Sequence, residues 1–153
     1  MFLAPRRSSC QRGLTEAERA LAASAFMRAF GGDRGFDYDA VRLIDGRFVP
    51  WQWPRYVVTP GNRIYWPGLP PCLASCAAPL AALFVHEMAH VWQHQHGVNL
   101  LLRGGLSQCA HFLSGKRWNP YVLPLGVPFA RLNLEQQAQY VSYQLFPDCV
   151  PTR

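Results

Sequence analysis

The feature that most constrains this chain is the run His86-Glu87-Met88-Ala89-His90, which reads H-E-x-x-H. On a helix, residues four apart lie on one face, so both imidazoles can reach one metal ion. Glu87 lies beside that face and can take a proton from a metal-bound water. The pattern predicts zinc as the cofactor, with His86 and His90 as ligands and Glu87 as general base in the hydrolysis of a peptide or similar bond.

The helix that carries this motif has clear expected bounds. Pro67 to Pro71 interrupts the chain before it, and Pro79 is favoured in the first turn of a helix. Gly97 is suited to a C-terminal cap. We therefore expect the motif helix to run from about Ala78 to His96.

Two histidines do not complete the site, because a catalytic zinc normally has three protein ligands and a water. His94 continues the row of His86 and His90 but lies another turn (~6 Å) along the axis, too far to share the ion. The His94 side chain should contact the ligand side chains without binding the ion itself, or face solvent. His96 occupies the last histidine of the metzincin pattern H-E-x-x-H-x-x-G-x-x-H, but Gln93 replaces the glycine at which that helix breaks. On an unbroken helix His96 points away from His90.

Glu135 is the favoured third ligand. After Asp45 the chain has only three acidic residues, which are Glu87, Glu135 and Asp148. Asn133 with Gln136 is a capping signal that begins a helix from Leu134 to about Phe146, and Glu135 falls in its first turn. A glutamate on a later helix resembles the arrangement of the gluzincins. Asp148 and His111 remain alternatives, and Glu135 could instead interact only with its own helix N-terminus.

The rest of the chain predicts an α+β fold, a minimal zincin-like domain spanning residues 14–153 after a flexible arm of residues 1–13. Thr15 and Glu18 form a capping box before a helix from Glu16 to Phe30. A small antiparallel sheet is expected from residues 40–44, 56–58 and 63–66. Asp45-Gly46 signals a hairpin whose return strand would begin at Phe48. A long irregular loop, residues 98–131, separates the motif helix from the C-terminal helix that carries the third ligand.

Charge and hydropathy exclude several classes of protein. The formal net charge is +6, but the arginines are dispersed along the chain and form no basic stripe, so nucleic-acid binding is only weakly supported. The N-terminus lacks the apolar region of a signal peptide, and the longest apolar stretch, residues 73–85, is too short to span a membrane. We expect a protein without a membrane span that is cytoplasmic in the cell that makes it.

The five cysteines contain no Cys-x-x-Cys pair, and their pairing is left open.

Four segments together resemble a known family. They are the Leu14-Thr15 helix start, the stretch Phe36 to Arg42, the run His86 to Gly97, and Asn133 to Ala138. They are similar to small bacterial Vgr-related proteins and to the metallopeptidase domains attached to type VI secretion spike (VgrG) and Rhs proteins. This resemblance implies a zinc metallopeptidase-like fold with His86, His90 and Glu135 as ligands and Glu87 as the base.

The resemblance also implies a role in contact-dependent toxin delivery. The expected partners are a protein or peptide substrate, a secretion-apparatus spike and an immunity protein. Export by a type VI secretion system would carry the chain into a target cell, the periplasm included. The alternative is a zinc-stabilised binding or adaptor module of a secretion system without hydrolysis. Five further residues could donate a hydrogen bond to the transition state or could contact the side chains of the metal ligands. They are His94, His96, His111, Tyr121 and Tyr140.

Overall fold

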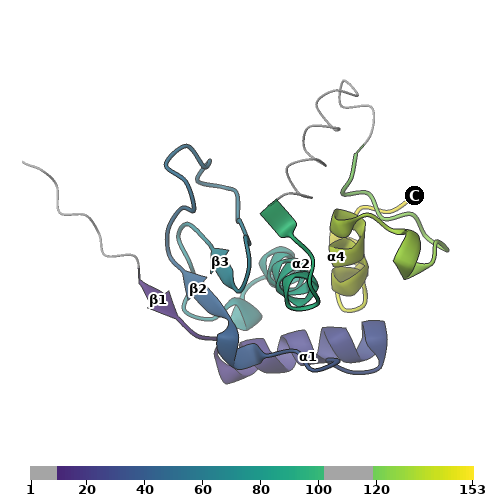
Figure 1. Ribbon diagram of the computed structural model, residues 1–153, viewed down its shortest axis with the longest axis horizontal. Coiled ribbons are helices and arrows are strands. Elements are labelled where there is room, and N and C mark those ends of the chain that lie inside the picture. The colour runs from purple at the N-terminus through teal and green to yellow at the C-terminus, as the bar shows by residue number, and fades with distance from the viewer. Residues whose placement is uncertain (1–9, 102–118) are drawn as a thin grey trace, which may run out of the picture.

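The computed structural model describes residues 10–101 and 119–153. It is a small α+β domain, as the sequence predicts. Three helices dominate the described residues: α1 (Glu16–Phe30), α2 (Ala78–Gln95) and α4 (Leu134–Tyr143). A three-stranded sheet is formed by β1 (Gln11–Arg12), β2 (Arg42–Ile44) and β3 (Arg63–Tyr65). Figure 1 looks along α2, which lies between the sheet and α4, with α1 beneath.

The predicted capping signals set the helix bounds. The Thr15 hydroxyl accepts from the Glu18 backbone N–H while the Glu18 carboxylate accepts from the Thr15 N–H, and Gly31 ends α1 with φ of 75°. The Asn133–Gln136 capping box begins α4 in the same way. α4 ends at Tyr143, three residues before the expected limit, and α2 ends at Gln95 with His96 as its cap.

The sheet differs from the expected antiparallel meander. β1 and β2 are antiparallel, but β2 and β3 are parallel, with Leu43 opposite Ile64. The Asp45-Gly46 turn leads to no return strand, because the Asp45 carboxylate instead accepts from the backbone N–H groups of Gly68 and Leu69. The expected strand 56–58 is reduced to a single bridge between Val58 and Tyr65. In the register of this bridge the next hydrogen-bonded pairs would join Pro60 to Arg63 and Tyr56 to Pro67, and neither proline can donate to a ladder.

The N-terminal arm is also partly ordered, against expectation. Gln11 and Arg12 pair with β2, and the Arg12 guanidinium donates to the buried Glu18 carboxylate at 2.7 and 2.9 Å. Glu18 also accepts from the backbone N–H of Leu73, just before α2. These bonds hold the pKa of Glu18 below its usual value although burial alone would raise it. The first nine residues of the arm lie outside the described residues.

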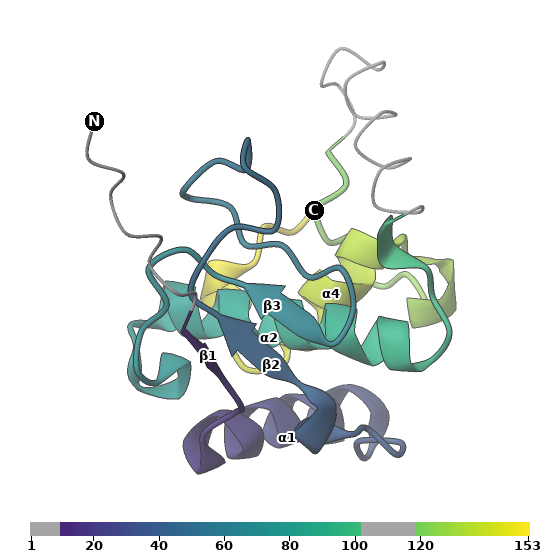
Figure 2. The same ribbon diagram turned by 60° about the vertical axis from the view of Figure 1, so that its left-hand side comes forward.

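The core is built around α2. Phe84, Val85, Met88 and Val91 are fully buried and pack with residues of α1, α4 and the sheet in one hydrophobic cluster. α2 packs most closely against α4, and Ser142 Oγ donates to the Ala82 carbonyl across that contact at 2.9 Å. Figure 2 shows α2 and α4 behind the sheet and α1 below it. The face of α2 that carries the histidines is thereby set against α4.

The structure describes only part of the long loop that the sequence predicts. Of the loop 98–131, residues 102–118 lie outside the described residues; Leu123, Leu132 and Val150 form a second small cluster beside α4. Among the helices that the structure describes, none is long and apolar enough to cross a membrane. Cys10, Cys72, Cys76 and Cys149 are free thiols, and Cys109 lies outside the described residues.

Candidate metal centre

The three expected ligands come together between α2 and α4. His86 and His90 project from one face of α2, and Glu135 extends toward them from the first turn of α4. Both histidines are buried, and the Glu135 side chain is 16% exposed. The ligand atoms of all three residues lie within 4.8 Å of one another.

The distances within this triad fit a tetrahedral metal ion. The two imidazole Nε2 atoms are 3.1 Å apart, and Glu135 Oε2 lies 3.2 Å from Nε2 of His86 and 3.3 Å from Nε2 of His90. Ligands held ~2.0–2.1 Å from a tetrahedral zinc are about 3.3 Å from each other. Two imidazoles and one carboxylate are also a common donor set of catalytic zinc. The residues present therefore fit a zinc ion without rearrangement of the helices.

Glu135 lies within ion-pair distance of both histidines. Burial by itself would lower the pKa of His90, but the hydrogen bond and charge of Glu135 raise it to about 9. For Glu135, burial favours the protonated form, yet the hydrogen bonds from His86 and His90 outweigh it and hold the pKa well below its usual range. A metal ion entering this site would therefore displace a proton held by the triad.

Gln93 is a positioning residue that the sequence analysis missed. It is 1% exposed, and its amide nitrogen donates to the Leu134 carbonyl at 2.9 Å and to Gln137 Oε1 at 3.1 Å. Its oxygen is left to accept from His90 Nδ1 at 2.8 Å. Because Nδ1 carries the hydrogen in this bond, Nε2 is the nitrogen that can present a lone pair to a metal. Gln93 thus orients the His90 ring and ties it to α4, the helix that carries Glu135.

We expect Gln93→Leu to weaken zinc binding about 10- to 100-fold, because the His90 ring loses its orienting acceptor. Competition with a chromophoric chelator measures the affinity, and circular dichroism checks the fold. Gln95→Leu is the matched control, since Gln95 is on the same helix but bonds to Asp37 and Asn62. Equal zinc affinity in the two variants would show that Gln93 does not orient His90.

Glu87 has a partner that the sequence does not reveal. Its carboxylate is buried, and Oε2 accepts a hydrogen bond of 2.5 Å from the hydroxyl of Thr59. Thr59 belongs to the segment between β2 and β3, and the next glycine in it, Gly61, lies against the ring of His94. This segment therefore covers the motif helix beside the triad. Thr59 thus holds one oxygen of the Glu87 carboxylate, Oε2, and Oε1 takes no part in this bond.

The remaining candidates fall in different places. His94 contacts Gly61. His96 is exposed and lies away from the triad. Its ring stacks on Trp92, with ring centroids 4.1 Å apart, and its Nδ1 bonds to the Trp92 carbonyl. Tyr140 packs its ring against Phe129. His111 lies outside the described residues, and Asp148 is exposed in a 3-10 turn, Pro147–Cys149, after α4.

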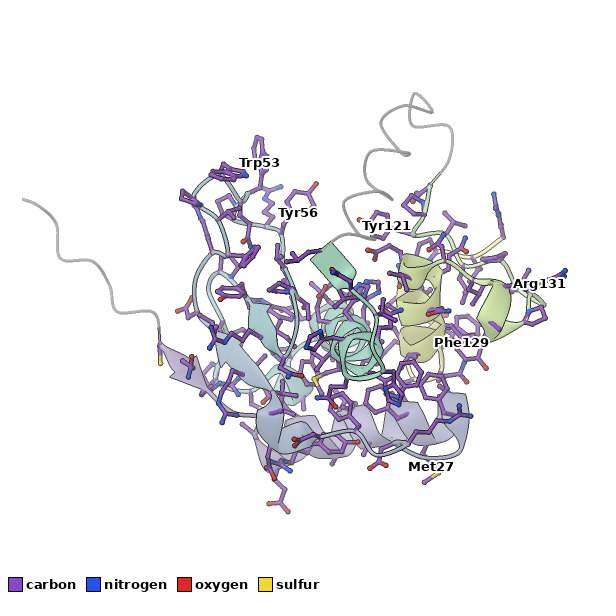
Figure 3. The ribbon with its side chains drawn as sticks, in the orientation of Figure 1. Met27, Trp53, Tyr56, Tyr121, Phe129 and Arg131 are labelled. Carbon is purple, nitrogen blue, oxygen red and sulfur yellow. The ribbon has the colours of Figure 1, made fainter. Side chains whose placement is uncertain are left out.

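Tyr121 belongs to the segment that packs on the start of α4. The residue after it, Val122, accepts through its carbonyl from Gln136 Nε2 at 3.1 Å, which holds this segment against the first turn of α4. That turn also carries Glu135. Figure 3 shows the Tyr121 side chain near α4, on the same side of the molecule as Trp53 and Tyr56.

Comparison with known proteins places this chain in a family. The chain is 38% identical to the effector domain of Pseudomonas aeruginosa VgrG2b, a solved structure, with a TM-score of 0.75 over 90% of this chain and 75% of that one. The chain belongs to the VgrG2b effector-domain family. It is also 41% identical over 133 residues to the type VI secretion system spike protein VgrG2b of Pseudomonas aeruginosa. The match covers 85% of this chain but 12% of the spike protein, and no family model matches. The Vgr-related resemblance expected from the sequence is confirmed.

Proposed function

We propose that this chain is a zinc-dependent metallopeptidase. The observation that supports it best is the triad itself, because His86, His90 and Glu135 have the separations of tetrahedral zinc ligands and Glu87 follows the first of them on α2. A structural zinc site is normally closed by four protein ligands, whereas three protein ligands leave a position open for water. Among the described residues the cluster holds three.

His86, His90 and Glu135 would hold the ion, which when bound lowers the pKa of a water toward ~7 and polarises a carbonyl. Glu87 takes the proton from the attacking water and passes it to the leaving amine. The Thr59 hydroxyl restrains Oε2 of that carboxylate, so the base keeps one orientation through both transfers. Gln93 keeps Nε2 of His90 directed at the centre. Tyr121 is the proposed donor to the developing oxyanion.

We further propose that the chain acts as an effector of type VI secretion. Its membership of the VgrG2b effector-domain family supports this role. On this proposal the chain reaches a target cell by way of the spike apparatus, its substrate is a protein or peptide there, the periplasm included, and the producer carries an immunity protein against it.

A peptidase assay with zinc-loaded and metal-stripped protein tests the enzymatic part. We expect cleavage of a mixed peptide library by the zinc-loaded chain, loss of cleavage on chelation and recovery when zinc is restored. Zinc should also raise the melting temperature, since it binds the folded state. Stoichiometric zinc binding without cleavage would instead identify a zinc-stabilised binding or adaptor module.

A further inference from the structure

The segment Arg47–Tyr56, which we name the aromatic loop, exposes large apolar side chains that the proposed hydrolysis does not use. Trp51 is 79% exposed, Trp53 73% and Tyr56 65%. Tryptophan is a largely buried residue in most folded proteins, so two exposed on one short loop need an explanation. Figure 3 shows Trp53 at the outer end of this loop, away from the helices, with Tyr56 nearby.

The loop is held in shape by Gln52, which lies between the two tryptophans and is buried. Its side-chain oxygen accepts from the Phe48 backbone N–H at 2.6 Å, and its side-chain nitrogen donates to the Tyr56 carbonyl at 2.7 Å. The Phe48 ring packs on Tyr65 of β3, which anchors the start of the loop to the sheet. The internal amide ties both ends together, and the neighbouring tryptophans are thereby directed outward.

Charge limits what can cover these aromatic side chains. Arg47 and Arg55 are exposed within the loop, and within the described residues neither forms an ion pair. From Gly46 to His86 the sequence contains no aspartate or glutamate. The loop therefore presents tryptophan and tyrosine together with positive charge and no negative charge. That combination matches the interface of an anionic bilayer, where amphipathic rings sit at the headgroup level and arginines pair with phosphates.

The shape of the loop favours a bilayer over a peptide. Figures 1 and 2 show the chain between β2 and β3 projecting from the body of the domain. An extended peptide is normally bound in a groove or on a sheet edge, with pockets for alternate side chains. Outward-pointing rings on a projecting loop can enter a lipid surface without any such groove. We propose that the aromatic loop docks this domain on membranes that contain anionic phospholipid.

Membrane docking would place the proposed hydrolysis at a bilayer surface. The docking itself does not require the hydrolysis. Thr59, which contacts Glu87, follows the last residue of the loop by three positions. A domain bound through the loop would therefore hold its metal centre close to the bilayer surface. Substrates anchored in or lying on that surface would be favoured over peptides in solution.

Vesicle binding by the full chain tests the proposal, with and without zinc. Vesicles of phosphatidylethanolamine and phosphatidylglycerol should bind the chain, whereas phosphatidylcholine vesicles should bind it at least tenfold more weakly. Brominated lipids in the anionic vesicles should quench tryptophan fluorescence. The double variant Trp51→Ala/Trp53→Ala should bind at least about tenfold more weakly and lose most of the quenching. Arg47→Ser and Arg55→Ser should each reduce binding about fivefold, and added salt should weaken it further.

Met27→Ala is the matched control, because Met27 is an exposed apolar residue (59%) on α1, away from the aromatic loop. It should bind vesicles as the unchanged chain does. Absence of binding to anionic vesicles would overturn the proposal, as would equal binding by the double tryptophan variant. The unchanged chain could instead fail to bind vesicles while the double variant has a higher KM for soluble peptides. That result would overturn membrane docking and assign the loop to substrate binding. Vesicle binding without any peptidase activity would overturn the proposed function alone.

Discussion

Glu87→Gln is expected to reduce kcat/KM for peptide hydrolysis about 10²- to 10⁴-fold while leaving zinc bound. Glutamine keeps the size of the side chain but cannot accept the proton of the attacking water, and removal of a positioned general base has effects of this size. Its amide can still make a hydrogen bond with Thr59, so the segment between β2 and β3 should stay in place. Steady-state kinetics and metal analysis of the same preparation separate the two effects.

Glu16→Gln serves as the control for that variant, because Glu16 is an exposed carboxylate in the first turn of α1. It should leave both kinetics and zinc content unchanged. Undiminished turnover by Glu87→Gln would remove Glu87 from the mechanism and require another base. Loss of zinc together with activity would show that Glu87 supports the metal rather than the proton transfer.

Glu135→Ala is expected to lower zinc affinity by more than about 100-fold and to abolish cleavage at limiting zinc. Loss of a ligand should exceed the 10- to 100-fold cost of losing an outer partner of a ligand. Asp148→Ala is the matched control, since Asp148 is the alternative carboxylate and lies exposed after α4. Chelator competition measures both variants. Full zinc occupancy in Glu135→Ala, with loss in Asp148→Ala, would reverse the assignment of the third ligand.

Local sequence signals predicted the helices and the position of the histidines. The Thr15–Glu18 and Asn133–Gln136 capping boxes each satisfy free backbone N–H groups within four residues, so their effect does not depend on the rest of the fold. The spacing of His86 and His90 likewise follows from helix geometry alone. Glu135 could be singled out because carboxylates are scarce in the second half of the chain, and the structure brings it to the histidines.

Features that depend on distant residues were not predictable in this way. The parallel pairing of β2 with β3 requires the chain to leave the sheet and return in the same direction, and the Asp45-Gly46 signal pointed instead to a tight hairpin. Thr59 and Gln93 carry no motif. Their roles arise only when the β2–β3 segment lies on α2 and when α4 packs beside it. The clue available for Gln93 was its place three residues after His90, facing the same side of the helix.

The contact between α2 and α4 bears on how the binding free energy of a metal ion would be divided between folding and affinity. His86 and Glu135 are 49 residues apart, and bringing such distant points together costs about 3 kcal/mol of chain entropy. Packing between the two helices and bonds such as Ser142 to Ala82 and Gln93 to Leu134 help to offset that cost. In a zinc finger the ion's binding energy is consumed in folding the chain. In this domain, by contrast, more of a metal ion's binding energy would remain available for affinity, so removal of the ion is expected to leave the helices packed.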